Sequence, residues 1–363
     1  MQSPPDEALI ARAASLIEDA DALIVAAGAG MGVDSGLPDF RGKDGFWRAF
    51  PALGRAQIEF YGIASPSAFH ATPALAWGFY GHRLALYRET VPHSGFGLLK
   101  HWGERMLHGY SVFTSNVDGQ FQKAEFDPSS IHECHGSIHH LQCLEPCSES
   151  IWEANAFYPE VDAHECRLRN SAPTCPRCGA LTRPNVLMFG DRGWVERRAA
   201  AQAFRQEAWL SSVSRPLVIE VGAGTTIPSV RHFSQRVIHQ FGGRLIRINP
   251  NESEVPFGGE ESVRGFGRCS ATNTRERPSQ ETRWGCQGQR VGARDSARES
   301  SNGPVPAPRS PPRRDRTCRP DDFAPRGQSW RHRVGAVTPE AVPGNARGSM
   351  AVQGPDDAGR GRL

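Results

Sequence analysis

The amino-acid sequence predicts an α/β fold with a doubly wound parallel sheet, a helical insert and a small cysteine-containing module. Four short apolar runs, at residues 22–27, 111–113, 216–221 and 244–248, each end in small or polar residues. Continuous apolar runs of this length are typical of parallel strands that are buried on both faces. Because ligands bind beyond the carboxyl ends of parallel strands, we expect these four ends to line one crevice.

Two of these runs lead into glycine turns. The first run is followed by Gly28-Ala29-Gly30 and the third by Gly222-Ala223-Gly224. A strand, a glycine turn and a helix in this order begin many nucleotide-binding folds, because the glycines let phosphate groups approach exposed backbone amides. Glycine turns are common, so this pattern alone is weak evidence for nucleotide binding.

The remaining segments predict helices and a second insert. Residues 7–19 place apolar side chains at helical spacing, which indicates an amphipathic helix before the first strand. A segment at about 44–100 is rich in aromatic residues and is predicted to be a helical insert whose rings form a core or a pocket wall. A second insert, at about 136–184, has few large aliphatic residues and needs a staple to hold its fold.

Four cysteines in the second insert offer that staple. They form a C-x3-C pair and a C-x2-C pair with 27 residues between the pairs: Cys143, Cys147, Cys175 and Cys178. Such pairs can supply the four thiolates of a tetrahedral structural zinc site without an open coordination position. Two alternatives stay open, namely four buried free thiols or the replacement of one ligand by Cys166 or His164.

Residues 255–363 differ in composition from residues 1–254. They contain no Ile, Lys or Tyr and a single Leu, and they carry 19 Arg against 12 acidic residues. A segment with no Ile and a single Leu cannot bury enough apolar surface to offset the entropy of ordering. The sequence therefore predicts one folded domain over 1–254 and a disordered Arg/Pro/Gly-rich tail over 255–363. Such a tail either attracts nucleic acid weakly or has no partner.

The sequence also indicates the cellular compartment in which the protein is expected. No apolar stretch approaches the roughly 20 residues that span a bilayer, and Asp6 and Glu7 stand where a signal peptide would be basic. The protein is therefore expected to be cytoplasmic, with no membrane partner. In that reducing compartment, metal binding is favoured over disulfides for the clustered cysteines.

The segment GAGMGVDSGLPDFRG at 28–42 plainly resembles the sirtuins, the family of NAD-dependent protein deacylases. The resemblance continues through TSNVDG at 114–119, HG at 135–136, NVLMFGD at 185–191, VGAGTT at 221–226 and INPNE at 248–252. It covers about 250 residues and excludes the tail. It implies a Rossmann-like fold, NAD and zinc as cofactors, acylated lysines of proteins as substrates, and release of nicotinamide and O-acyl-ADP-ribose.

The resemblance also implies three catalytic residues. His135 would be the general base on the ribose hydroxyls, and a histidine suits this task because its ordinary pKa lies near neutrality. Asn116 would orient the ribose and a water molecule. Asp118 would hold the carboxamide of nicotinamide.

Further positions match the cofactor and peptide sites of the family. Phe40 and Arg41 would belong to the cofactor-binding loop, where the aromatic ring screens the reacting carbon from water. The acylated peptide would add as a strand beside Phe189 and Gly190. The cofactor-binding residues implied in this way are Gly28, Ala29, Gly30, Asp39, Phe40, Arg41, Ser115, Asn116, Asp118, Gly222, Gly224, Thr225 and Asn249.

The acyl preference can be predicted from residues 76–83. Tyr80 and Arg83 are three residues apart and therefore share one helical face. A guanidinium and a phenol together can bind a carboxylate, which favours succinyl-, malonyl- or glutaryl-lysine over acetyl-lysine. The pair matches the Tyr-x-x-Arg pattern of the desuccinylase class, and Ala64 stands where that class has a small residue. The alternative is that Tyr80 and Arg83 belong to a surface helix.

Two other functions compete with deacylation. The same cofactor chemistry would serve an NAD-dependent ADP-ribosyltransferase or an NAD hydrolase, which differ only in the acceptor. The chain could also be a non-catalytic module that binds NAD or a peptide. The presence of Asn116, Asp118 and His135 argues against the non-catalytic alternative.

Overall fold

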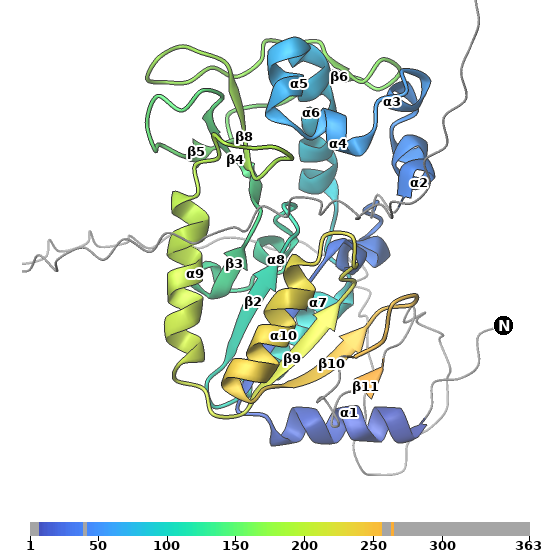
Figure 1. Ribbon diagram of the computed structural model, residues 1–363, viewed down its shortest axis with the longest axis vertical. Coiled ribbons are helices and arrows are strands. Elements are labelled where there is room, and N and C mark those ends of the chain that lie inside the picture. Colours follow the sequence, from blue (N-terminus) through green and yellow to red (C-terminus); the bar gives the residue numbers. More distant parts are fainter. Residues whose placement is uncertain (1–6, 39–41, 256–262, 265–363) are drawn as a thin grey trace, which may run out of the picture. The chain divides into compact units, whose positions relative to one another are not determined.

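The computed structural model describes residues 7–38, 42–255 and 263–264 (Figure 1). The chain divides into two units, residues 1–277 and 278–363, and the fold below is that of the first unit. Three predicted cofactor-loop residues, Asp39, Phe40 and Arg41, lie outside the described residues. So does the predicted tail, apart from residues 255, 263 and 264, and the predicted boundary at 254 stays a prediction.

The centre of the first unit is a six-stranded sheet in the order β11-β10-β9-β1-β2-β3, with every neighbouring pair parallel. Ala27 is paired with Thr114 on one side and with Val221 on the other, and Val221 is paired with Ile248. The four predicted strand ends therefore meet at one edge of the sheet. The strands are β1 (Ala22–Ala27), β2 (Tyr110–Thr114), β3 (Ile131–Glu133), β9 (Pro216–Val221), β10 (Arg244–Ile248) and β11 (Val263–Arg264).

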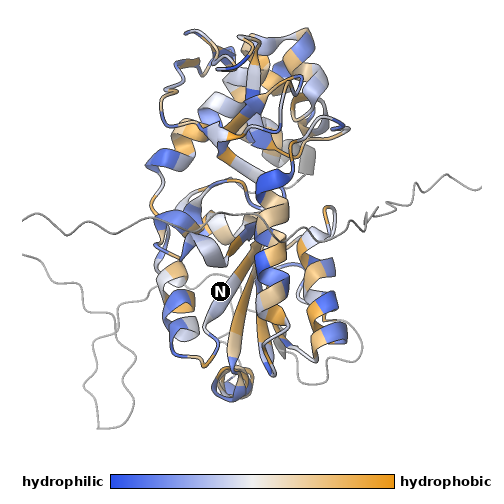
Figure 2. Ribbon diagram, turned by 90° about the vertical axis from the view of Figure 1, so that its left-hand side faces the viewer, coloured by the Kyte–Doolittle hydropathy of each residue, from blue (hydrophilic) through white to orange (hydrophobic). Residues whose placement is uncertain are grey.

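Helices cover both faces of this sheet, because successive side chains of a strand point to opposite faces. Leu23 and Val25 of β1 pack in one apolar core with α1 (Glu7–Asp19) and α7 (Ser94–Glu104). Ile24 and Ala26 pack in a second core with α9 (Arg197–Leu210) and α10 (Ser229–Phe241). Figure 2 shows these strands mostly in the colours of apolar residues, between helices that carry both kinds. The predicted doubly wound fold is thus confirmed.

Five of the helices between the first two strands share a third apolar core. Trp77 and Phe79 are fully buried there, and the indole N–H of Trp77 donates to the carbonyl of Thr182 at 3.0 Å. The predicted insert at about 44–100 ends too late, because α7 packs on the large sheet and not in this core. The helices are α2 (Gly42–Ala49), α3 (Pro51–Arg55), α4 (Phe60–Ile63), α5 (Pro66–Ala71) and α6 (Pro73–Glu89).

The second insert forms a small module next to α6. Its antiparallel sheet, in the order β5-β4-β8, comprises β4 (Gly136–Cys143), β5 (Trp152–Glu153) and β8 (Thr182–Val186). A hairpin of β6 (Val161–Asp162) and β7 (Arg167–Leu168) contacts α6. Gly78 allows this contact, since a Cβ at that position would lie 2.0 Å from the carbonyl oxygen of Cys166.

Three short helices complete the described part of the chain. The glycine turn after β1 continues as a 3₁₀ helix, η1 (Ala29–Ser35), and a second one, η2 (Pro128–Ser130), precedes β3. The short helix α8 (Gln120–Lys123) follows the loop after β2. Within the described residues, no helix combines the length and the apolar character that crossing a membrane requires.

Candidate functional site

The loops at the carboxyl edge of the large sheet enclose a cavity of about 690 Å³. Most residues predicted for the cofactor, the reaction and the acyl group line it: Gly28, Ala29, Gly30, Ser115, Asn116, Asp118, His135, Gly222, Gly224, Ala64, Tyr80, Arg83 and Phe189. Thr225, Asn249 and Gly190 lie beside it without lining it. The predicted convergence of strand ends therefore produces one crevice that continues to α6.

The glycines of the first turn allow two loops to touch. A Cβ on Gly28 would lie 2.7 Å from the carbonyl oxygen of Gly222, and a Cβ on Gly30 would lie 2.7 Å from the Cα of Gly222. Gly222 itself has a φ of 64°, a left-handed conformation that favours glycine. The loops after β1 and β9 thus pack backbone against backbone. This contact between the loops is a reason for the glycines that the sequence did not reveal.

Asn116 is fixed by the ends of the two central strands. Its side-chain amide donates to the carbonyl of Gly28 at 2.9 Å, and its backbone N–H donates to the hydroxyl of Thr114 at 3.0 Å. The Thr114 hydroxyl in turn donates to the carbonyl of Ala27 at 3.0 Å. This network ties the loop after β2 to the end of β1, so that Asn116 stands at the floor of the cavity.

Asp118 is a buried carboxyl group on the same loop. It is 8% exposed, and its Oδ1 accepts the backbone N–H of Gln120 at 3.0 Å. Burial raises the pKa of Asp118 to about 6, and the nearby Arg83 guanidinium opposes this rise. The carboxyl is therefore poised to change its charge near neutral pH, which is typical of functional sites.

His135 reaches the cavity directly after β3. Its Nε2 lies 3.0 Å from the hydroxyl of Ser229, the first residue of α10. Burial lowers the pKa of His135, and a hydrogen bond with the backbone of Ser115 partly offsets this effect. The imidazole is therefore neutral at pH 7 and able to accept a proton. No motif in the sequence pointed to Ser229, because its contact with His135 arises from packing between distant segments.

Tyr80 and Arg83 lie at the α6 side of the cavity, and both are buried, with 1% and 7% of their surface exposed. The alternative that they belong to a surface helix is therefore wrong. Burial raises the pKa of Tyr80 to about 12, so the phenol keeps its proton. The Arg83 Nε donates to the hydroxyl of Tyr87 at 3.0 Å. Tyr87 also lines the cavity and had no motif that would have identified it.

The segment after β8 forms another wall of the cavity. The backbone N–H of Phe189 donates to the carbonyl of Ala64 at 2.9 Å, and the ring of Phe189 packs at a tilt against Tyr61 with 4.8 Å between centroids. A buried ion pair holds this turn, because both terminal nitrogens of Arg183 donate to the Asp191 carboxylate, at 2.6 and 2.9 Å.

Two of the three predicted residues beside the cavity, Asn249 and Thr225, hold the loops that border it. Asn249 donates its side-chain amide to the carbonyl of Ala223 at 2.9 Å, and its Oδ1 accepts two backbone N–H groups. The Thr225 hydroxyl donates to Glu252 at 3.2 Å, and Arg231 bonds both Ala223 and Glu252. These contacts join the loops after β9 and β10. The predicted role of Asn249 and Thr225 in cofactor binding stays a prediction.

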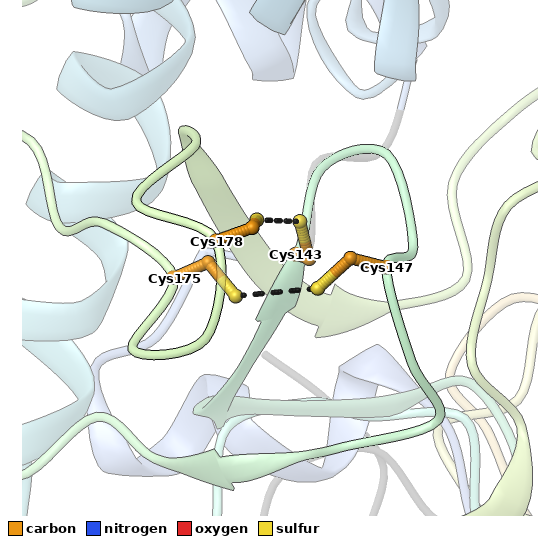
Figure 3. A group of neighbouring side chains, drawn as sticks. All are labelled: Cys143, Cys147, Cys175 and Cys178. Carbon is orange, nitrogen blue, oxygen red and sulfur yellow. Dashed lines mark hydrogen bonds between the residues drawn. The ribbon is translucent and has the colours of Figure 1, made fainter.

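The four predicted cysteines form one cluster in the small module (Figure 3). Their sulfur atoms all lie within 4.8 Å of one another, and two of the pairs are 3.6 and 3.7 Å apart. A tetrahedral zinc ion with Zn–S bonds of about 2.3 Å separates its ligands by about 3.8 Å. The sulfur positions therefore fit zinc. Neither Cys166 nor His164 belongs to this cluster among the described residues.

The fold, the glycine-lined crevice and the cysteine cluster define an α/β protein with a dinucleotide-type site and a structural metal module. Residues 28–210 match the model of the Sir2 family, and the chain belongs to that family. The predicted resemblance to sirtuins is thereby confirmed.

Relatives and a solved structure agree with this assignment. An NAD-dependent protein deacylase of Aquifex aeolicus is 29% identical over 233 residues, which is 64% of this chain and 85% of that protein. One of Thermococcus kodakarensis is 29% identical over 259 residues, 71% of this chain and 91% of that protein. A Sir2 homologue solved with ADP-ribose shares the fold, with a TM-score of 0.51 and 22% identity over 72% of this chain and 90% of its own. The predicted enzyme class and its cofactor NAD are thus confirmed, and the cysteine cluster is consistent with the predicted zinc.

Proposed function

We propose that this protein is an NAD-dependent protein-lysine deacylase that prefers succinyl-, malonyl- or glutaryl-lysine to acetyl-lysine. One observation carries the preference: Tyr80 and Arg83 are buried in the wall of the same cavity that Asn116, Asp118 and His135 line. A cation at this position matches an acyl group that ends in a carboxylate.

Each of the three predicted catalytic residues in the cavity has its own role in the proposed reaction. NAD, when bound, supplies the ribose carbon that accepts the acyl oxygen as nicotinamide leaves. His135 takes a proton from a ribose hydroxyl, because its imidazole is neutral and hydrogen-bonded to Ser229. Asp118 holds the nicotinamide carboxamide. Asn116, fixed by Gly28, orients the ribose.

The general-base role can be tested directly. His135→Ala should reduce deacylation to near background while zinc content and melting temperature stay those of the parent protein. His101→Ala, at an exposed position on α7, serves as the control and should retain full activity. Parent-like activity of the His135 variant would contradict the assignment.

The acyl preference rests on the burial of the clamp formed by Tyr80 and Arg83. Guanidinium and phenol groups donate hydrogen bonds to a carboxylate, and charge-assisted bonds of this kind are stronger in a buried site than in water. An acetyl group offers no acceptor at that distance along the chain. Sites built to hydrogen-bond a group discriminate strongly against analogues that lack it.

The decisive experiment compares matched succinyl-lysine and acetyl-lysine peptides with NAD, following peptide mass and nicotinamide together. Faster removal of succinyl is expected, and Arg83→Met should reduce desuccinylation far more than deacetylation. Arg169→Met removes an exposed arginine paired with Asp162 and is the matched control. Equal losses on both substrates would refute the clamp. Nicotinamide release with both peptides intact would indicate ADP-ribosyl transfer or NAD hydrolysis instead.

A further inference from the structure

A second tyrosine belongs to the face of α6 that carries the clamp. Tyr87 follows Arg83 by four residues, and Phe79 and Tyr80 precede it by four and three, so all four side chains share one face. The centre of the guanidinium lies 5.1, 5.6 and 5.4 Å from the ring centroids of Phe79, Tyr80 and Tyr87. Arg83 is therefore held among three aromatic rings.

The hydrogen bond to Tyr87 determines how the guanidinium is presented. A guanidinium can bind a carboxylate through its end edge, Nη1 and Nη2, or through its side edge, Nε and one Nη. In this structure Nε donates to the Tyr87 hydroxyl at 3.0 Å. The side edge is thereby committed to Tyr87. The end edge is then the one that suits a carboxylate at the far end of an acyl chain.

Tyr87 is itself anchored by the loop that carries Asp118. Its backbone carbonyl accepts a hydrogen bond from the buried side-chain amide of Gln120, at 3.2 Å. Lys123 donates to the carbonyl of Arg88 at 2.7 Å, which places a cation at the carboxyl end of α6. Both donors belong to α8, directly after the Asp118 loop. Tyr87 is thus fixed at its backbone and at its hydroxyl.

We infer that Tyr87 is a positioning residue that sets the selectivity for acidic acyl groups by holding the Arg83 guanidinium end-on to the acyl carboxylate. This inference rests on the proposed acyl preference. It assigns the clamp three members on one helix, in which Tyr87 acts through Arg83 and not on the reacting atoms. The ring of Tyr87 contributes packing, whereas its hydroxyl contributes the selectivity.

The test is Tyr87→Phe, which removes the hydroxyl and keeps the ring. KM for the succinyl-lysine peptide should rise about tenfold, in keeping with the loss of one charge-assisted hydrogen bond, while kcat changes less than about twofold. KM for the acetyl-lysine peptide should stay the same, which also reports that the variant folds. Tyr110→Phe is the matched control, because the Tyr110 hydroxyl accepts a backbone N–H from Asp127 away from the cavity.

A double-mutant cycle separates positioning from a general structural effect. In the Arg83→Met background, Tyr87→Phe should cause no further loss with succinyl-lysine, because the group it positions is gone. An additive loss, an equal loss on both peptides, or an unchanged succinyl-to-acetyl ratio would overturn the role of Tyr87. A parent protein without a preference for succinyl-lysine would refute the acyl proposal itself, and that result is visible before any variant is made.

Discussion

The buried carboxyl of Asp118 makes the stability of this protein depend on pH. Asp118→Asn keeps the size of the side chain and the Oδ1 acceptor for the Gln120 N–H, and it removes the charge. Because Asp118 is 8% exposed, its ionised form is poorly solvated in the folded protein. We expect the variant to be more stable than the parent protein at pH 7.

The magnitude follows from the pKa. Burial raises the pKa of Asp118 from the ordinary value of 3.8 to about 6, and each pKa unit corresponds to about 1.4 kcal/mol. The folded state therefore binds the proton more tightly than the unfolded state. Below pH 4 both states are protonated and the penalty is absent. It grows between pH 4 and 6 and reaches about 3 kcal/mol above pH 6.

The assay is urea unfolding of the parent protein and of Asp118→Asn at intervals from pH 4 to pH 8. The difference in the free energy of unfolding should increase with pH and level off above pH 6. Asp127→Asn is the control. It should change the free energy of unfolding in the opposite direction, since hydrogen bonds from Ser129 lower the pKa of that exposed carboxyl. A difference for Asp118→Asn that is independent of pH, or a parent protein that is more stable at pH 7, would refute the reasoning. Because Asp118 is proposed to hold the nicotinamide carboxamide, nicotinamide release by Asp118→Asn should fall sharply.

Three further predictions concern the metal, the substrate wall and the pH profile. Cys175→Ser should reduce zinc from one ion per chain to near zero and lower the melting temperature, as metal analysis and calorimetry would reveal. Asp191→Ala should lower the free energy of unfolding by about 3–5 kcal/mol, because it leaves the buried Arg183 charge without its carboxylate; a loss below 1 kcal/mol would contradict this. The acid limb of kcat/KM assigned to His135 should lie below pH 6.5, since burial lowers its pKa, and a limb above that value would contradict the lowered pKa.

Much of the site was accessible from the sequence because its parts are local patterns. Four apolar runs with small or polar ends predicted the strands, and their common edge followed from the rule for parallel sheets. The spacing of the four cysteines predicted their cluster, since two short pairs can approach a common ion. That Tyr80 and Arg83 share one face followed from helical spacing. In each case the prediction depends on short patterns, each of which spans only a few neighbouring residues.

The rest of the site depends on contacts between distant segments. Ser229 meets His135 across 94 residues, and Arg231 joins the loops after β9 and β10 only because α10 packs beside both. Composition could not separate α7 from the helical insert, because both have buried aromatic side chains. Tyr87 shares its helix with Arg83, but its part in the clamp depends on the rotamer that brings the hydroxyl to Nε.

The two ends of the cavity are electrostatically connected through Arg83. Its guanidinium lowers the pKa of Asp118 and so opposes the effect of burial on that carboxyl. An acyl carboxylate bound to Arg83 would neutralise this cation and bring a second negative charge into the same cavity. Binding of an acidic acyl group is therefore expected to raise the pKa of Asp118 further, whereas an acetyl group should leave it unchanged. Under the proposed acyl preference, the clamp would both select the acyl group and influence the charge of Asp118.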